Sequence, residues 1–128
     1  MKELTKAEEQ IMQILWKLER GVVKDIIEKM PEPKPAYNTV STIVRILETK
    51  GFVDHQAFGK THQYFPLISK DSYSHFSLNN LVSGYFNGSF KNLVSFFTNE
   101  AKMDVQDIDQ LMKQLDELKN NELKNKKP

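Results

Sequence analysis

The fold is decided by residues 36–66, which read AYNTVSTIVRILETKGFVDHQAFGKTHQYFP. The first half of this stretch repeats apolar residues at helical spacing, which predicts a helix over 36–50 that Gly51 stops. One face of that helix is apolar and carries Val40, Ile43, Val44 and Leu47. The other face carries short polar side chains and one arginine: Asn38, Ser41, Thr42, Arg45 and Thr49.

The second half of the stretch predicts a β-hairpin. Two short runs, 52–58 and 61–66, contain residues typical of strands and flank Gly59-Lys60. We therefore expect two antiparallel strands joined by a tight turn.

Two further helices are expected before residue 36. Thr5 followed by Glu8 has the spacing of a capping box, and the apolar pattern after it predicts a helix over 5–18. A second, short helix is predicted over 22–30, because the three prolines that follow do not permit a regular helix. Three helices and a hairpin in this order are typical of a winged helix-turn-helix.

The rest of the chain predicts further helices. Apolar residues recur at helical spacing over 78–86 and again over 90–97, with Gly88 between them, and a last helix follows Asp104. Three such helices in about 55 residues cannot easily bury their apolar faces against one another without leaving apolar surface exposed. We therefore expect a second copy of the chain to cover them, through the following residues: Leu78, Leu81, Val82, Tyr85, Phe86, Phe90, Ile108, Leu111 and Leu115.

The predicted fold class is mostly α with a small β-hairpin wing. We expect an N-terminal winged helix-turn-helix domain over 1–68, a C-terminal helical dimerisation domain over 69–123 and a flexible tail over 124–128. No stretch has the length and apolar character of a membrane span or a signal peptide, so we expect a cytoplasmic protein.

The sequence shows no constellation of residues that indicates an enzyme. It has no cysteine, no HExxH motif, no glycine-rich phosphate loop and no GxSxG motif. His55 and His62 are placed to face each other across the hairpin, and His75 lies in the next helix. Without cysteine or a tight cluster of histidine and acidic residues, we expect no metal ion, cofactor or catalytic residue.

Charge by itself does not indicate a nucleic-acid partner. The net charge is +1, with 11 basic and 9 acidic residues up to Lys70 and 7 basic and 8 acidic residues after it. Because neither half is strongly basic, a case for DNA binding must come from the organisation of the chain.

The polar face of the helix over 36–50 is the best candidate for contact with DNA. Short polar side chains and an arginine can reach base edges in the major groove while the opposite face stays in the core. The residues expected to bind DNA, including the hairpin tip and the start of the first helix, are Lys6, Tyr37, Asn38, Thr39, Ser41, Thr42, Arg45, Lys60 and Thr61. Lys24 is a further candidate for a phosphate contact. The alternatives are that Asn38 or Thr39 merely caps the helix and that the hairpin tip is a plain surface turn.

Over essentially its full length the chain resembles the penicillinase-repressor family (BlaI/MecI/CopY type). Five groups of residues carry the resemblance: LTKAE at 4–8 leading to ILW at 14–16, YNTVST at 37–42, LETKGF at 47–52, YFPL at 64–67 and YFNGS at 85–89. Each stretch is weak by itself, and together they are specific.

The resemblance implies a homodimer that binds a dyad-symmetric operator in double-stranded DNA and represses transcription, commonly of antibiotic-resistance genes. In members that answer β-lactams, a membrane sensor with a zinc-protease domain triggers cleavage of the repressor, in a region that corresponds to 90–100. Where the best-known members have an Asn-Phe pair at the cut, this chain has Phe96-Phe97.

Two further departures from the family pattern bear on function. The copper-responsive branch uses a C-terminal cysteine cluster, which this chain lacks. Relatives often place arginine directly before the Leu-Glu pair of the helix over 36–50, whereas this chain has Ile46 there and Arg45 one step earlier. We therefore expect a different operator preference and no copper sensing by that route.

Two alternatives to a DNA-binding repressor of this kind stay open at this point. The first is a small-molecule-responsive regulator whose aromatic segment 73–97 forms a pocket with Phe76, Phe86 and Phe90. The second is a winged helix used only for protein contacts, which the near-zero net charge permits.

Overall fold

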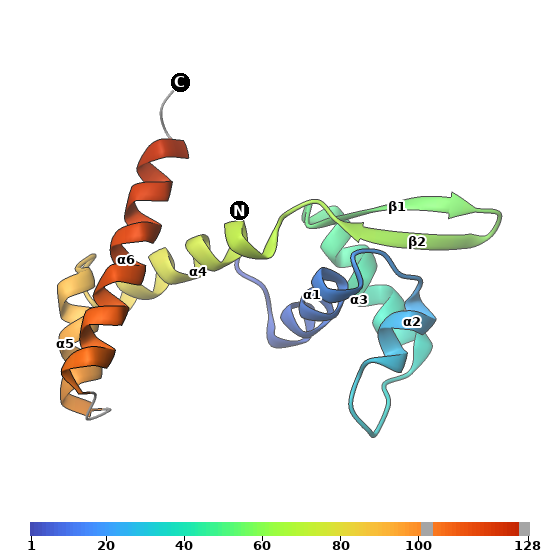
Figure 1. The fold of residues 1–128 in the computed structure, drawn as a ribbon. Coiled ribbons are helices and arrows are strands. Elements are labelled where there is room, and N and C mark those ends of the chain that lie inside the picture. Colours follow the sequence, from blue (N-terminus) through green and yellow to red (C-terminus); the bar gives the residue numbers. More distant parts are fainter. Residues whose placement is uncertain (101–103, 126–128) are drawn as a thin grey trace. The chain divides into compact units, whose positions relative to one another are not determined.

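The computed structural model describes residues 1–100 and 104–125 and divides the chain into two compact units, Met1–Ser74 and the part from His75 onward. The fold is mostly helical with one hairpin, as predicted (Figure 1). In chain order the elements are α1 (Lys6–Leu18), α2 (Val23–Glu28), α3 (Tyr37–Thr49), β1 (Val53–Phe58), β2 (Thr61–Pro66), α4 (Lys70–Tyr85), α5 (Phe90–Glu100) and α6 (Val105–Asn125).

Helix α1 begins at the predicted capping box. The N–H of Glu8 donates to the Thr5 hydroxyl at 3.2 Å, and the N–H of Thr5 donates to the Glu8 carboxylate at 2.9 Å. These two bonds satisfy backbone donors that the first turn of a helix otherwise leaves without a partner.

The core of the first unit lies among α1, α2, α3 and the base of the hairpin. Its fully buried side chains are Ile11, Met12, Leu15, Ile26, Val40, Val44, Leu47, Phe52 and Val53. Burial of a large apolar side chain is worth about 1.5–3 kcal/mol, so this set dominates the stability of the unit. Gly51, the second residue after α3, adopts φ +84°, which lets the chain turn so that Phe52 enters the core.

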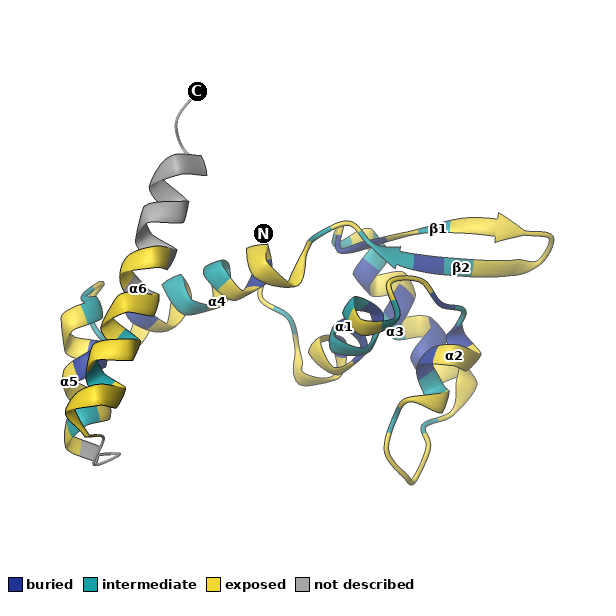
Figure 2. Ribbon diagram, in the orientation of Figure 1, coloured by how far each residue is buried: buried dark blue, intermediate teal, exposed yellow. Residues whose placement is uncertain are grey.

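The hairpin is buried at its base and exposed at its tip (Figure 2). Its strands pair antiparallel from Val53 opposite Pro66 to Phe58 opposite Thr61. Gly21 adds an isolated bridge, because its N–H donates to the Tyr64 carbonyl at 3.0 Å and its carbonyl accepts from the Tyr64 N–H at 2.8 Å. This bridge fixes the hairpin to the segment between α1 and α2.

The first turn of α4 belongs to the first unit. The Tyr73 ring lies 5.7 Å from Phe52 and 6.1 Å from Trp16, and its hydroxyl accepts a hydrogen bond from the Leu4 N–H at 3.0 Å. The Trp16 indole donates to the Ile68 carbonyl at 2.9 Å. The first unit therefore extends past the boundary expected at residue 68.

The second unit has its own small core. Val82, Leu93 and Val94 are buried, and partly buried residues from three helices pack on them: Leu78, Phe86, Phe90, Ile108 and Leu111. Six of the nine residues expected at a dimer interface thus pack within one chain, and their part in a dimer stays a prediction. Leu81 and Tyr85 are exposed, and the side chain of Leu115 lies outside the described part.

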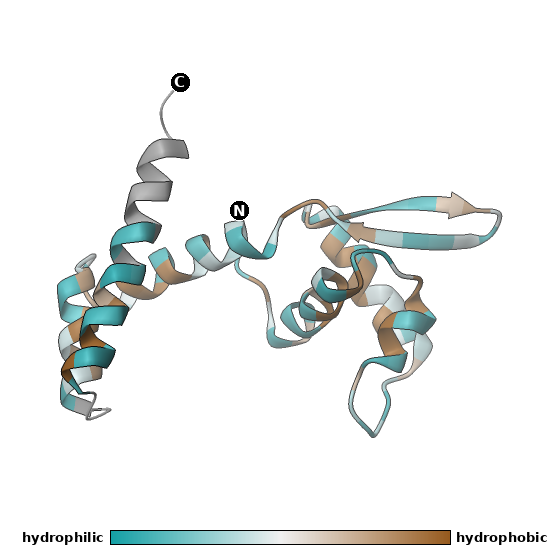
Figure 3. Ribbon diagram, viewed as in Figure 1, coloured by the Kyte–Doolittle hydropathy of each residue, from teal (hydrophilic) through white to brown (hydrophobic). Residues whose placement is uncertain are grey.

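Helix α6 is amphipathic and continues to Asn125, past the expected domain end at 123 (Figure 3). The last three residues of the expected tail lie outside the described residues. Over 1–100 and 104–125, no helix combines the length and apolar character needed to cross a membrane.

Candidate nucleic-acid interface

The outward face of α3 is polar and exposed. Opposite the buried Val40, Val44 and Leu47, the exposed side chains are Asn38, Thr39, Thr42, Arg45, Ile46 and Thr49. The helix has Ala36 as its N-cap, which makes no side-chain cap bond. Neither Asn38 nor Thr39 is the N-cap, so the alternative that one of them merely caps the helix is wrong.

Ser41 does not lie on this exposed face, where we expected it. It is only 9% exposed. One residue after Val40 it has turned by about 100° around the helix, which puts it at the edge of the apolar face, and neighbouring elements cover that edge. Tyr37 and Arg45, four residues before and after Ser41, lie along the same line of the helix.

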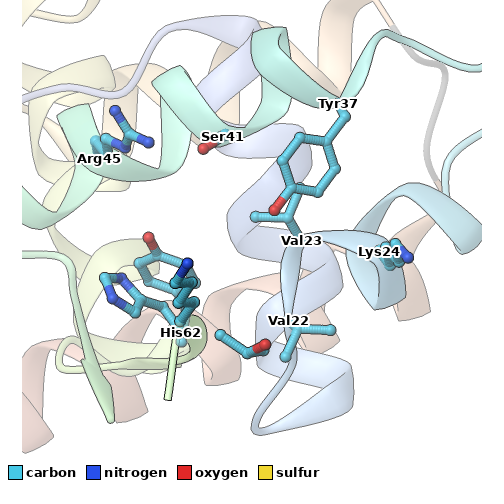
Figure 4. Close-up of a pocket in the computed structure, with 10 residues that line it drawn as sticks. Val22, Val23, Lys24, Tyr37, Ser41, Arg45 and His62 are labelled. Atoms are coloured by element: carbon cyan, nitrogen blue, oxygen red, sulfur yellow. The ribbon is translucent and has the colours of Figure 1, made fainter. Parts of the chain in front are cut away.

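A pocket of about 260 Å³ lies at this edge of α3, between the helix, the start of α2 and the hairpin (Figure 4). We call it the wing pocket. Its lining residues are Val22, Val23, Lys24, Tyr37, Ser41, Arg45, Lys60, Thr61, His62 and Tyr64. Figure 4 shows the hydroxyls of Tyr37 and Ser41 turned toward the space between α3 and the hairpin.

The wing pocket is lined by cations and hydroxyls without an acidic residue. Lys24 comes from α2, Arg45 from α3 and Lys60 from the hairpin turn. Such a lining favours a negatively charged group.

Tyr64 closes the pocket on the hairpin side. It is 4% exposed, and this burial, together with the Glu48 carboxylate, raises the pKa of its phenol above the usual value, while Arg45 acts against the rise. The phenol therefore stays neutral near neutral pH and keeps its proton as a hydrogen-bond donor.

Two histidines stack beside the wing pocket, as expected from their positions across the hairpin. The rings of His55 and His62 lie 4.2 Å apart with an interplanar angle of 10°. His55 Nδ1 also contacts the Glu48 carboxylate, which joins β1 to α3.

A group of three possible metal ligands is present, which the sequence analysis did not foresee. One ligand atom each of Glu48, Asp54 and His55 lies within 4.8 Å of the others. Glu48 comes from α3, so strand spacing alone does not reveal the group. Its contact with His55 gives these residues a structural role in holding the hairpin to α3.

The remaining candidate residues are placed as follows. Lys6 is exposed at the first residue of α1 and is not among those lining the wing pocket. Lys60 and Thr61 lie at the hairpin tip, are exposed, and line the pocket. The sequence did not reveal four further residues of the pocket as neighbours of the DNA-binding candidates, because hairpin and helix meet only in the folded unit: Val22, Val23, His62 and Tyr64.

Two of the three phenylalanines assigned to a small-molecule pocket are used in packing. Phe86 and Phe90 pack on the core of the second unit, and the Phe86 ring lies 5.6 Å from that of Phe96. This packing gives the two side chains a structural role.

Comparison with known proteins reveals relatives along most of the chain. The chain is 26% identical over 110 residues to the methicillin resistance regulatory protein MecI of Staphylococcus aureus (strain N315), which covers 85% of this chain and 89% of the relative. It is 23% identical over 119 residues to the penicillinase repressor of Bacillus licheniformis, covering 92% and 93%. The solution structure of the DNA binding domain of the repressor BlaI matches 57% of this chain and 94% of its own, with 25% identity and a TM-score of 0.49.

The chain also matches the sequence model of a whole family. The sequence model of the family described as Penicillinase repressor matches residues 4–117, which include the winged helix and most of the C-terminal helices. This chain therefore belongs to the penicillinase repressor family, whose members are winged-helix transcriptional repressors and not enzymes.

Proposed function

We propose that this repressor binds a dyad-symmetric operator in double-stranded DNA as a homodimer, with α3 of each subunit in the major groove of one half-site. Repression would then follow from occupation of the promoter. The observation that carries the proposal is the polar, exposed face of α3 beside a pocket lined by cations.

The outward face of α3 has the chemistry needed to read base edges. Asn38 offers an amide that can pair with adenine, and Arg45 offers two parallel donors for guanine. Thr42 lies between them along the helix and can donate or accept. Since the opposite face is fixed in the core, these side chains are held by a rigid element.

The hairpin tip and the start of α1 supply contacts that position the protein without reading sequence. Lys60 and Thr61 are exposed at the tip, and Lys6 is exposed at the start of α1. Contacts of this kind go to backbone phosphates, and they make the affinity dependent on salt.

The second unit is proposed to form the dimer through apolar side chains that its own core leaves exposed. These are Leu81, Tyr85, Phe96, Phe97, Val105 and Met112, with exposed fractions from 40% to 80%. So many exposed apolar side chains in one small unit are typical of an interaction surface. A dimer links two DNA-binding units and so raises the effective concentration of the second at its half-site.

Control of antibiotic-resistance genes and inactivation by proteolysis are part of the proposal. Phe96 and Phe97 are exposed in α5. A cut in this helix would remove part of the proposed dimer surface and weaken binding without changing any base contact. The partner that triggers it would be a membrane sensor protease.

The proposal is tested by a gel-shift titration on the DNA upstream of the protein's own gene, at several salt concentrations and with unrelated DNA as competitor. Specific binding with two chains per operator supports it. Release of the DNA by an intact small molecule would favour a ligand-responsive regulator instead. Absence of any salt-dependent DNA binding would favour a winged helix that contacts only proteins.

A further inference from the structure

We propose that the wing pocket is a binding site for one phosphate group. The inference rests on the proposed function in one respect, because a backbone phosphate of the operator is one source of that group. The other source is a free phosphorylated small molecule, which would then compete with DNA for the same place.

The first argument is charge. Lys24, Arg45 and Lys60 come from three different elements and line one pocket. Among the described residues, none of the three forms an ion pair with a carboxylate, and no acidic residue lines the pocket. A lining that is positive and without a counter-charge favours a negatively charged group.

Two nearby acidic side chains are already engaged elsewhere. The Asp25 carboxylate accepts a hydrogen bond from the Val22 N–H at 3.0 Å. The Glu48 carboxylate contacts His55. Neither contact is with one of the three cations of the wing pocket, so these two carboxylates do not take the place of an anion there.

The second argument is the hydroxyl of Ser41. The residue is 9% exposed and lines the pocket, and its hydroxyl has no hydrogen bond with another described residue. No side-chain oxygen or nitrogen of the described residues is fully buried without a partner, so the Ser41 hydroxyl is open to the pocket and takes its partner from there. A ligand oxygen in the pocket supplies one, and the Tyr37 hydroxyl, turned toward the same space, supplies a second donor (Figure 4).

The third argument is size and position. A pocket of about 260 Å³ is much larger than the roughly 30 Å³ that one water molecule occupies in the liquid. It adjoins the line of α3 that carries Arg45, so a DNA backbone beside the major groove passes close to it. A phosphate held there would also fix the hairpin relative to α3, because both elements supply ligands.

The first arm of the test uses inorganic phosphate and the full-length protein without DNA. Amide chemical shifts are followed by NMR while phosphate replaces chloride at constant ionic strength. We expect saturable shifts at Ser41 and around Lys60, and about tenfold weaker binding in the Ser41→Ala and Lys60→Gln variants. The matched control is Lys29→Gln, which removes an exposed lysine that does not line the pocket and should leave phosphate binding unchanged.

The second arm replaces single operator phosphates by neutral methylphosphonates. If a backbone phosphate occupies the pocket, a methylphosphonate at that one position should weaken wild-type binding about tenfold. The same methylphosphonate should not weaken the binding of the Lys60→Gln variant any further. Thermal unfolding of each variant verifies that it is folded.

The two arms separate the sources of the phosphate and the two proposals. Phosphate-specific shifts with loss in both pocket variants support a site for free phosphate compounds, and coupling in the second arm supports a site for the operator backbone. Absence of both results overturns the inference. The first arm needs no DNA, so it decides the nature of the pocket even where operator binding itself fails.

Discussion

The ammonium group of Lys50 lies 2.8 Å and 2.9 Å from the two carboxylate oxygens of Glu8, and this pair joins the end of α3 to the first turn of α1. Glu8 is 4% exposed. Burial would raise the pKa of its carboxyl, but the hydrogen bonds from Lys50 and Thr5 together with the Lys50 charge outweigh it, and the pKa lies below its usual value.

Glu8→Gln should lower the free energy of unfolding by about 2 kcal/mol at pH 7, because the charged hydrogen bonds to Lys50 are lost. The folded-state pKa of Glu8 is depressed, so the stabilisation is present above the unfolded value near 4.5 and is lost as the pH falls through the folded value. Urea unfolding at pH 7 and pH 3 measures both states. The exposed Glu9→Gln in the same turn is the control, and an equal deficit of Glu8→Gln at both pH values would contradict the assignment.

Tyr73→Phe should lower the free energy of unfolding by about 1 kcal/mol, because the hydrogen bond from the Leu4 N–H is lost. Tyr73→Ala should cost about 3 kcal/mol, because it also leaves a cavity beside Trp16 and Phe52. Urea unfolding of the full chain gives both values. Tyr85→Ala removes a tyrosine that is 80% exposed within one chain, and monitoring at low protein concentration keeps any dimer contribution small. If Tyr73→Ala lowers the free energy of unfolding no more than Tyr85→Ala does, the Tyr73 side chain does not pack on the first unit.

Arg45→Ala should weaken operator binding by about 1–3 kcal/mol if Arg45 pairs with a base through two hydrogen bonds. Lys60→Ala should instead lower the slope of log affinity against log salt by about 1, because it removes one phosphate contact. Fluorescence anisotropy over a range of salt concentrations distinguishes the two effects. Lys17→Ala, an exposed lysine at the end of α1, serves as control. Unchanged binding in both variants would rule out the assigned DNA-binding face.

Ile46 should contact a thymine methyl group in the operator. It is 43% exposed on the outward face of α3, so part of an apolar side chain is open to a partner outside the chain. Ile46→Ala should cost about 1 kcal/mol in operator affinity, and replacing the contacted thymine by uracil should cost wild type the same. The Ile46→Ala variant should lose no further affinity when uracil replaces the thymine. Leu67 is another exposed apolar residue, and Leu67→Ala should bind both operators as wild type does. Additive losses from Ile46→Ala and uracil would contradict the contact.

Tyr85→Asp should shift the protein toward monomer and weaken operator binding, because a charge would be buried in the proposed dimer surface. The residue is 80% exposed within one chain, so the substitution should leave the monomer folded. Sedimentation velocity and anisotropy measure the two effects, with the exposed Ser83→Asp as matched control. A Tyr85→Asp protein that stays dimeric with full affinity would mean that another surface forms the dimer.

Local signals in the sequence were sufficient for the elements of the first unit. The Thr5 capping box, the helix stop at Gly51 and the turn at Gly59 each act within a few residues, and each is present in the structure. The strand register pairs His55 with Tyr64 and His62 with Ala57, so the two stacked histidines are diagonal neighbours on one face of the hairpin.

Features that depend on tertiary contact could not be predicted in the same way. Helical periodicity places Ser41 at the edge of the apolar face but does not say that the hairpin and α2 cover that edge. The same holds for Tyr73, whose packing on Trp16 carries the first unit beyond residue 68. In the second unit, an apolar residue such as Phe86 can serve a core within one chain or an interface between two, and its pattern in the sequence is the same for both.

Hydroxyl-radical footprinting of the operator tests the central claim most directly. The account predicts two protected segments related by dyad symmetry on one face of the DNA, with centres separated by a multiple of about 10 base pairs, and their loss in Arg45→Ala at the same protein concentration. A single asymmetric footprint, or protection that survives removal of Arg45 and Thr42 together, would contradict a dimer that reads its operator through α3.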